Sequence, residues 1–153
     1  KFVHIFMTSI LIKNGLLVNE NEKFIADIFI EGDFIAEISR NGINRKATRV
    51  IEAEGKLVLP GIIDDQVHFR EPGLTHKAEI YTEAKAAVAG GTTSFMEMPN
   101  TNPQATTQTE LEKKYSRAQQ CSLANYSFFM GGTNDNLEEV LKTDPKNICG
   151  IKL

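Results

Sequence analysis

Short apolar runs separated by turn residues fill the first part of the chain. Apolar and polar positions alternate with a period of two in residues 26–30 and 34–38, which is typical of strands with one buried face. Other apolar runs predict further short strands at residues 10–12, 16–18, 49–51 and 56–59. Asn14-Gly15, between the first two runs, predicts a tight hairpin turn. We therefore expect residues 9–59 to form a small β-sheet or β-sandwich.

The pattern changes at Pro60-Gly61, where strand-like runs begin to alternate with helix-like segments. Strands are predicted at residues 61–64, 92–98, 124–130 and 147–153, and helices at residues 77–89, 109–120 and 135–142. Asp135 or Asn136 is predicted to cap the last helix. Such alternation predicts an α/β fold with a parallel sheet built from right-handed crossover units. Residues 60–153 therefore form a second predicted region.

Composition narrows the classes of function. The chain has 153 residues and a net charge of -3, too few residues for a complete (β/α)8 barrel of about 250. No basic surface indicates nucleic acid or an anionic membrane as a partner, and no apolar run approaches the ~20 residues of a membrane-spanning helix. Cys121 and Cys149 form no C-x-x-C pair, which suits the reducing cytoplasm.

The start of the chain is set apart from this organisation. Six residues precede Met7, and they include no long apolar segment followed by a small-residue cleavage site, as a secretory signal would. We interpret residues 1–6 as an upstream extension with the natural start at Met7. Residues 1–8 are therefore treated as a separate segment.

The densest group of candidate functional residues follows the first strand of the second region. Gln66, His68 and Arg70 alternate, so they would project to one side of an extended segment. Histidine can bind a divalent metal, and arginine can hold a carboxylate through two hydrogen bonds. The spacing alone is equally compatible with an ordinary polar strand end.

Several motifs in order give the sequence a family resemblance. They are PGIID at residues 60–64, HFREPG at 68–73, GGTT at 90–93, MPNTNP at 98–103 and GIKL at 150–153. Together they resemble dihydroorotases of the amidohydrolase superfamily, over the chain from about Ile10 onward. The resemblance implies a metal-dependent (β/α)8 TIM-like barrel, with its first half in residues 60–153. It also implies that residues 9–59 are the N-terminal β segment of a composite sandwich, and that the chain is a fragment.

The same resemblance implies an activity. Dihydroorotases reversibly hydrolyse (S)-dihydroorotate to N-carbamoyl-L-aspartate in de novo pyrimidine (UMP) biosynthesis, using a metal-activated hydroxide. The expected partner is therefore this small-molecule substrate, with no nucleic acid or membrane, and the full-length enzyme is expected to be a homo-oligomer. The general-base aspartate and further histidine ligands are expected on later strands. No catalytic residue is thus assigned here, and these residues alone should not turn over substrate.

The resemblance also assigns residues to the site. Arg70 and Asn100 correspond to the residues that bind the substrate carboxylate, and His68 to a residue that binds both metal and substrate. Lys152 corresponds to a lysine that is carboxylated in many members and bridges two Zn²⁺ ions, so one or two zinc ions are expected. From the sequence alone, Asn100 could equally be a turn residue after Pro99. Lys152 could equally be an ordinary lysine, because some dihydroorotases lack the bridge.

Gln66 departs from the family pattern, which has His-x-His at this point. A glutamine carbonyl oxygen is a weaker zinc donor than imidazole. Gln66 could be a weak ligand, a group beside the ligands, the sign of a one-metal site, or the sign of a catalytically silent dihydroorotase-like subunit. An allantoinase or hydantoinase type of cyclic amidohydrolase is a further alternative, which Arg70 and Asn100 disfavour.

Three remaining residues receive weaker assignments. Glu97 alternates to the same side of its strand as Phe95, and we expect a buried carboxylate behind the site. Asp64 could orient a ligand or make a structural hydrogen bond. His76 is interpreted as a surface or helix-cap residue.

Overall fold

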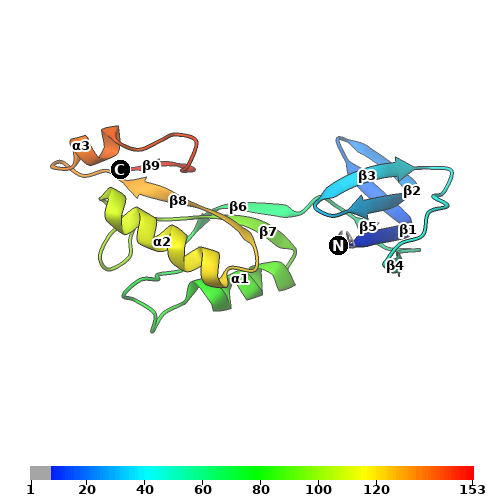
Figure 1. Cartoon of the computed structure of the whole chain (residues 1–153), viewed down its shortest axis with the longest axis horizontal. Helices are drawn as coiled ribbons and strands as arrows, with labels where there is room; N and C mark the ends of the chain where they lie inside the picture. Colours follow the sequence, from blue (N-terminus) through cyan, green and yellow to red (C-terminus); the bar gives the residue numbers. More distant parts are fainter. Residues whose placement is uncertain (1–7) are drawn as a thin grey trace, which may run out of the picture. The chain divides into compact units, whose positions relative to one another are not determined.

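The structure is a computed structural model that describes residues 8–153. The chain divides into two compact units, the first ending at Pro60 and the second running from Gly61 to Leu153 (Figure 1). The interpretation of the N-terminal extension concerns residues 1–7, which lie outside the described residues. In the described part of the chain, no helix has the length and apolar character needed to cross a membrane.

The first unit is one twisted sheet. Its strands are β1 (Ser9–Asn19), β2 (Glu22–Glu31), β3 (Phe34–Ser39), β4 (Arg49–Glu52) and β5 (Leu57–Val58). They lie in the order β3-β2-β1-β4, with β5 also paired to β1. The first three strands are antiparallel neighbours, whereas β4 and β5 run parallel to β1. The expected small sheet is therefore present.

The prediction of a hairpin turn at Asn14-Gly15 is wrong. β1 continues through this pair as an irregularity at which its register with β2 shifts. Asn14 adopts a left-handed conformation, with φ 57°, and its N–H donates to the Asp27 carboxylate at 2.8 Å. The turn instead lies at Glu20-Asn21, with φ values of 49° and 65°. Asparagine tolerates positive φ in bulges as well as in turns, so the motif alone does not separate the two.

The second unit is an α/β unit with a parallel sheet. Its elements are β6 (Ile62–Val67), α1 (Ile80–Ala89), β7 (Thr92–Glu97), α2 (Gln108–Cys121), β8 (Asn125–Gly131), α3 (Leu137–Leu141) and β9 (Gly150–Lys152). The strands follow the order β6-β7-β8-β9, and every neighbouring pair is parallel. The predicted strand–helix alternation and parallel sheet are confirmed, and Figure 1 shows the curled sheet beside α1 and α2.

Two helix starts differ from expectation, and in each case a side-chain hydrogen bond explains the difference. α1 begins at Ile80 rather than near residue 77, because the Glu71 carboxylate accepts the Ile80 N–H at 2.8 Å. Asn136 precedes α3 but makes no side-chain cap. Its side-chain oxygen accepts the Thr133 N–H at 2.7 Å, and its amide nitrogen donates to the carbonyl of Gly131 at 2.8 Å. The start of α1 is thus set by a residue outside the helix. The expected cap of α3 is replaced by hydrogen bonds within the preceding loop.

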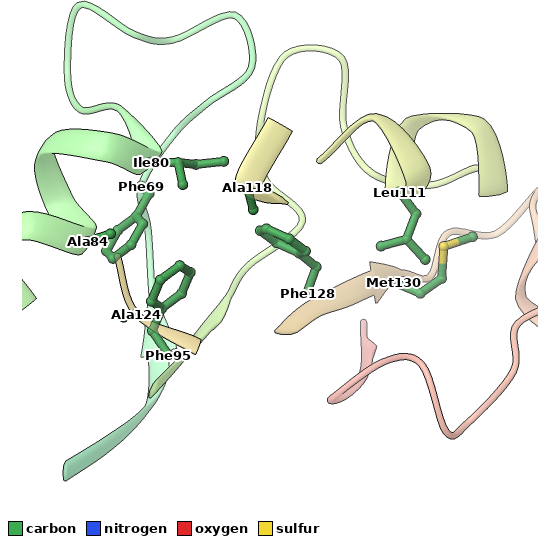
Figure 2. Packing of buried hydrophobic residues seen from close by; sticks show 9 residues of the cluster. All are labelled: Phe69, Ile80, Ala84, Phe95, Leu111, Ala118, Ala124, Phe128 and Met130. Atoms are coloured by element: carbon green, nitrogen blue, oxygen red, sulfur yellow. The ribbon is translucent and has the colours of Figure 1, made fainter. Parts of the chain in front are cut away.

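The core of the second unit lies between the sheet and its helices. Figure 2 shows Leu111 of α2 pointing towards Met130 of β8, and Phe69 and Phe95 close to Ala84 of α1. The rings of Phe69 and Phe95 have centroids 4.6 Å apart. Phe69 lies two residues beyond the end of β6, so this packing anchors the start of the loop that follows.

Phe128 is the central test of this core, since it is fully buried on β8. Phe128→Ala should lower the free energy of unfolding by about 3–5 kcal/mol, because it leaves a cavity between sheet and helix. Leu123→Ala, in the loop before β8, removes a side chain of a residue that is 56% exposed, so its cost should be about 0.5 kcal/mol. Urea unfolding of the complete protein that carries this chain measures both. Equal losses for the two variants would contradict the proposed packing.

Candidate active site

The loops after β6 and β7 meet at the carboxyl-terminal edge of the parallel sheet. Val67 is the register partner of Glu97, and the Met98 N–H donates to the Val67 carbonyl at 3.0 Å. Further along, the Asn102 N–H donates to the Pro72 carbonyl at 3.1 Å. The two loops are therefore joined by backbone hydrogen bonds at both ends, and the residues between these bonds are held close together.

Three predicted site residues meet in this space. His68 Nδ1 lies 3.0 Å from Asn100 Oδ1, and an Arg70 guanidinium N–H donates to the Asn100 backbone carbonyl at 3.3 Å. An amide oxygen can only accept, so His68 Nδ1 is the donor in this contact, and Nε2 makes no hydrogen bond within residues 8–153. β6 ends at Val67, so His68 and Arg70 belong to the loop that follows the strand.

The arrangement offers hydrogen-bond donors to an anion. Within residues 8–153, the remaining guanidinium N–H groups of Arg70 and the Asn100 amide nitrogen make no hydrogen bond. Both residues are half-buried, and His68 is exposed. A planar guanidinium beside an amide donor suits a carboxylate, which accepts hydrogen bonds through both oxygens. The cluster is chemically able to bind such a group.

The backbone around Arg70 is fixed from both sides. Arg70 itself has φ 66°, a conformation that a non-glycine residue adopts only where its surroundings impose it. Glu71 accepts the Ile80 N–H with one oxygen, as described, and with the other it contacts Arg117 Nε of α2 at 2.7 Å. This hydrogen bond with Glu71 raises the pKa of Arg117. The Glu71 carboxylate thus joins the site loop to α1 and α2.

Gln66 and Lys152 lie outside the cluster. Gln66 is exposed near the end of β6, and its backbone N–H donates to the Asp64 carboxylate at 3.2 Å. Lys152 is exposed on β9, where it is paired with Gly131, and the strands β7 and β8 separate it from β6. Both residues lie at the carboxyl-terminal edge of the sheet, as His68 does, and within residues 8–153 neither makes a hydrogen bond to His68, Arg70 or Asn100.

The donor set fits a metal in part. A histidine that donates Nδ1–H to a carbonyl oxygen presents Nε2 to a metal in its preferred tautomer, and His68 does this with Asn100. Among residues 8–153, however, no group of three or more His, Cys, Asp or Glu side chains could hold a metal ion. His68 is therefore the metal-ligand candidate best prepared by its surroundings.

Lys114, a residue of the site's surroundings, carries no motif in the sequence. Its side chain is fully buried beside Glu97, which is buried as expected. The available signal is its position: Leu111, Lys114 and Ala118 occupy the buried face of α2. A lysine on the apolar face of a helix implies a buried acceptor, although the helix alone does not say which one.

Comparisons with known proteins find related sequences and structures. The family model described as "Dihydro-orotase-like" matches residues 55–144. The chain is 47% identical over 95 residues to a dihydroorotase of Carboxydothermus hydrogenoformans, covering 61% of this chain and 22% of that protein. It is 46% identical over 115 residues to a dihydroorotase of Bacillus subtilis, covering 74% of this chain and 27% of that protein. The chain thus spans about a quarter of the length of these relatives.

A solved structure with another printed name is also similar. It is the L-hydantoinase (dihydropyrimidinase) from Arthrobacter aurescens, with a TM-score of 0.89 and 31% sequence identity. The match covers 95% of this chain and 32% of that one. The similarity in fold therefore extends over both units of the chain.

Gly73 tests the close approach of the two site loops. A Cβ at this position would lie 1.8 Å from the Asn102 carbonyl oxygen, and φ is +79°. Gly73→Ala should therefore separate the loops and lower the free energy of unfolding by more than about 2 kcal/mol, as measured by urea unfolding. Gly55→Ala is the matched control, since Gly55 has φ +72° and nothing within 4 Å. It should cost only about 1 kcal/mol, and equal costs would argue against the close approach.

Proposed function

This chain belongs to the dihydro-orotase-like family, and from that membership we propose that it forms part of a dihydroorotase. The complete enzyme would reversibly hydrolyse the ring amide of (S)-dihydroorotate to give N-carbamoyl-L-aspartate in pyrimidine biosynthesis. The curated relatives with the name dihydroorotase support this proposal. The remaining support comes from the chemistry of the loops after β6 and β7.

The observation that carries the proposal is the contact of His68 and Arg70 with Asn100. Dihydroorotate and carbamoyl-aspartate both carry a carboxylate on a carbon that one methylene group separates from the reacting carbonyl carbon. Arg70 and Asn100 would hold this carboxylate through charge-assisted hydrogen bonds, and so orient the amide for attack. His68, hydrogen-bonded to Asn100, would lie beside the bound ring.

Zinc is the proposed metal. When bound, it would lower the pKa of a water molecule and polarise the ring amide carbonyl. His68 would bind it through Nε2, and Gln66 would contribute a weaker oxygen donor. Lys152, carboxylated on Nζ, would offer two oxygen donors able to join two ions. The general base and further ligands would come from later strands, so these residues alone would be inactive.

The proposal extends to the architecture of the complete enzyme. The parallel sheet β6–β9 would be the first half of a TIM-like barrel, and the sheet β1–β5 part of a composite sandwich. The complete enzyme would be a cytoplasmic homo-oligomer acting on a small-molecule substrate.

Two other functions have specific observations in their favour. A hydantoinase type of cyclic amidohydrolase is favoured by the printed name of the similar solved structure, but hydantoin carries no carboxylate for Arg70 to bind. A catalytically silent dihydroorotase-like subunit is favoured by Gln66, a weaker zinc donor at the position where the family has histidine. The retained carboxylate-binding group, Arg70 with Asn100, favours the active enzyme over both.

Arg70 tests which substrate class is recognised. In the complete protein, Arg70→Met should raise the KM for dihydroorotate about 100-fold, because a hydrogen bond to a charged group contributes about 1.5–3 kcal/mol. Any hydrolysis of hydantoin should be unchanged. Arg40→Met removes an exposed ion pair with Glu22 in the first unit and should leave both activities unaltered. Faster turnover of hydantoin than of dihydroorotate by the natural protein would favour the hydantoinase alternative.

Gln66 tests whether the metal site is functional. The complete natural protein should contain zinc and lose dihydroorotase activity on chelation. Gln66→His should increase zinc affinity by about tenfold or more, because imidazole is the better zinc donor; a competitive zinc titration measures this. Gln119→His, on exposed α2 surface, is the control and should change nothing. A natural protein without zinc or activity, in which Gln66→His restores both, would support the silent subunit.

A further inference from the structure

Glu71 directly follows Arg70 in the chain and joins the site loop to both neighbouring helices. Glu71 is buried; one carboxylate oxygen accepts the Ile80 N–H at 2.8 Å, and the other accepts the Arg117 Nε–H at 2.7 Å. Glu79, the residue before α1, makes no side-chain cap. Glu71 therefore supplies the acceptor for the first N–H of α1, although nine positions separate it from Ile80.

The two contacts of Glu71 compensate a charge that is costly to bury. An ionised carboxylate away from water needs hydrogen bonds or an opposite charge beside it. The Ile80 N–H supplies a hydrogen bond, and the Arg117 guanidinium supplies a hydrogen bond together with the opposite charge. The Arg117 side chain is 43% exposed, so solvent weakens the attraction between the charges. The hydrogen bonds still direct the carboxylate towards α1 and α2.

The backbone on either side of Glu71 is also held by hydrogen bonds. The Arg70 carbonyl accepts the Leu74 N–H at 3.2 Å, and the Pro72 carbonyl accepts the Asn102 N–H at 3.1 Å. Arg70 itself has φ 66°, a conformation that persists only where the surroundings impose it. The side chain of Glu71 connects this short segment to the helices, so its contacts contribute to the support that Arg70 needs.

Arg70 and Glu71 make their contacts with different parts of the molecule. The Arg70 guanidinium donates to the Asn100 carbonyl in the loop after β7, whereas Glu71 contacts α1 and α2. Within residues 8–153, Arg70 makes no ion pair, although the next residue carries a carboxylate. Because Arg117 binds that carboxylate, the Arg70 guanidinium remains available to a carboxylate of a ligand.

We propose that Glu71 and Arg117 are positioning residues for Arg70, and through it for the substrate carboxylate. Glu71 sets the location of the Arg70 backbone through its contacts with the two helices. Arg117 holds the Glu71 carboxylate and so keeps it from pairing with the Arg70 guanidinium. For its effect on substrate, this inference rests on the proposed dihydroorotase function. Its effect on the loop is independent of that function.

The first test is Arg117→Met in the complete protein. The change removes a partly exposed charge and keeps apolar bulk, so the fold should be retained, as a thermal unfolding transition checks. The KM for dihydroorotate should rise about tenfold, because Glu71 becomes free to pair with Arg70, while kcat should change by less than about threefold. Arg117→Lys, which keeps the charge, should recover part of the loss. An unchanged KM for Arg117→Met would overturn the proposal.

Glu71→Gln tests the other member of the pair. The glutamine oxygen can still accept the Ile80 N–H, but the charge that Arg117 binds is removed, so KM should rise about three- to tenfold. Arg117→Met should then add less than about twofold to the KM of the Glu71→Gln protein, because both changes break the same contact. Independent, multiplying effects of the two changes would contradict their action as a pair.

Combination with Arg70→Met separates positioning from general damage. If Glu71 and Arg117 act through Arg70, neither change should alter the KM of the Arg70→Met protein by more than about twofold. Full multiplication with the Arg70→Met effect would overturn the proposal. Lys113→Met is the matched control on α2, since Lys113 makes an exposed ion pair with Glu110 at 2.6 Å; it should leave KM unaltered.

Hydrogen exchange gives a readout that needs no substrate. The amides of Leu74 and Asn102 donate to the carbonyls on either side of Glu71. They should exchange at least about fivefold faster in Glu71→Gln and Arg117→Met than in the natural protein or in Lys113→Met. Unchanged exchange would overturn the positioning role even if dihydroorotase activity is present. Faster exchange in a protein that does not hydrolyse dihydroorotate would support the loop-positioning role and count against the proposed function alone.

Discussion

The parallel register between β6 and β7 is the constraint on which the site depends. It pairs Val67 with Glu97 and so ends both strands at the same level of the sheet. The loops that follow the two strands therefore start side by side. This brings His68 into contact with Asn100, although 32 positions separate them in the sequence. A shift of one residue would send alternate side chains to the opposite face. The Glu97 carboxylate would then face away from α2, and the contact between the loops would be lost.

Residues of β7 pack in the core, whereas a residue of the loop after β7 contributes to the candidate site. Phe95 and Glu97 enter the layer between sheet and helices, where Phe95 packs on Phe69 and Glu97 meets Lys114. Asn100, three residues later, belongs to the polar edge. A site of this kind needs its binding groups held by rigid elements behind them. Here the aromatic contact holds the loop after β6 from its buried side, and Lys114, which donates to the Met98 carbonyl, contacts the start of the loop after β7.

Patterns of local spacing predict the elements of this chain, whereas contacts between distant residues decide their details. Alternation over residues 26–30 and 34–38 predicts β2 and β3, and the motifs HFREPG and MPNTNP identify the residues that meet at the site. The start of α1 depends on Glu71, nine residues away. Lys114 has no visible role until its partner on β7 is known. Asn14-Gly15 has the residues of a turn, but the pair lies in a bulge of β1, where the Asn14 N–H donates to the Asp27 carboxylate on the neighbouring strand.

The candidate site is chemically uneven along the sheet edge. The β6–β7 side carries an organised set of polar groups, with His68 Nδ1 against the Asn100 side-chain oxygen and Arg70 donating to the Asn100 backbone carbonyl. Among the metal-binding candidates, Lys152 lies on β9, with β7 and β8 between it and β6 in the order of the sheet, and Gln66 offers a weaker zinc donor than imidazole. Donors suited to a carboxylate therefore lie among these residues, whereas no group of three or more His, Cys, Asp or Glu side chains within residues 8–153 could hold a metal ion. In the proposed dihydroorotase, whose strand ends would converge around one barrel axis, this division would let one part of the rim orient the carboxylate while the amide reacts at the centre.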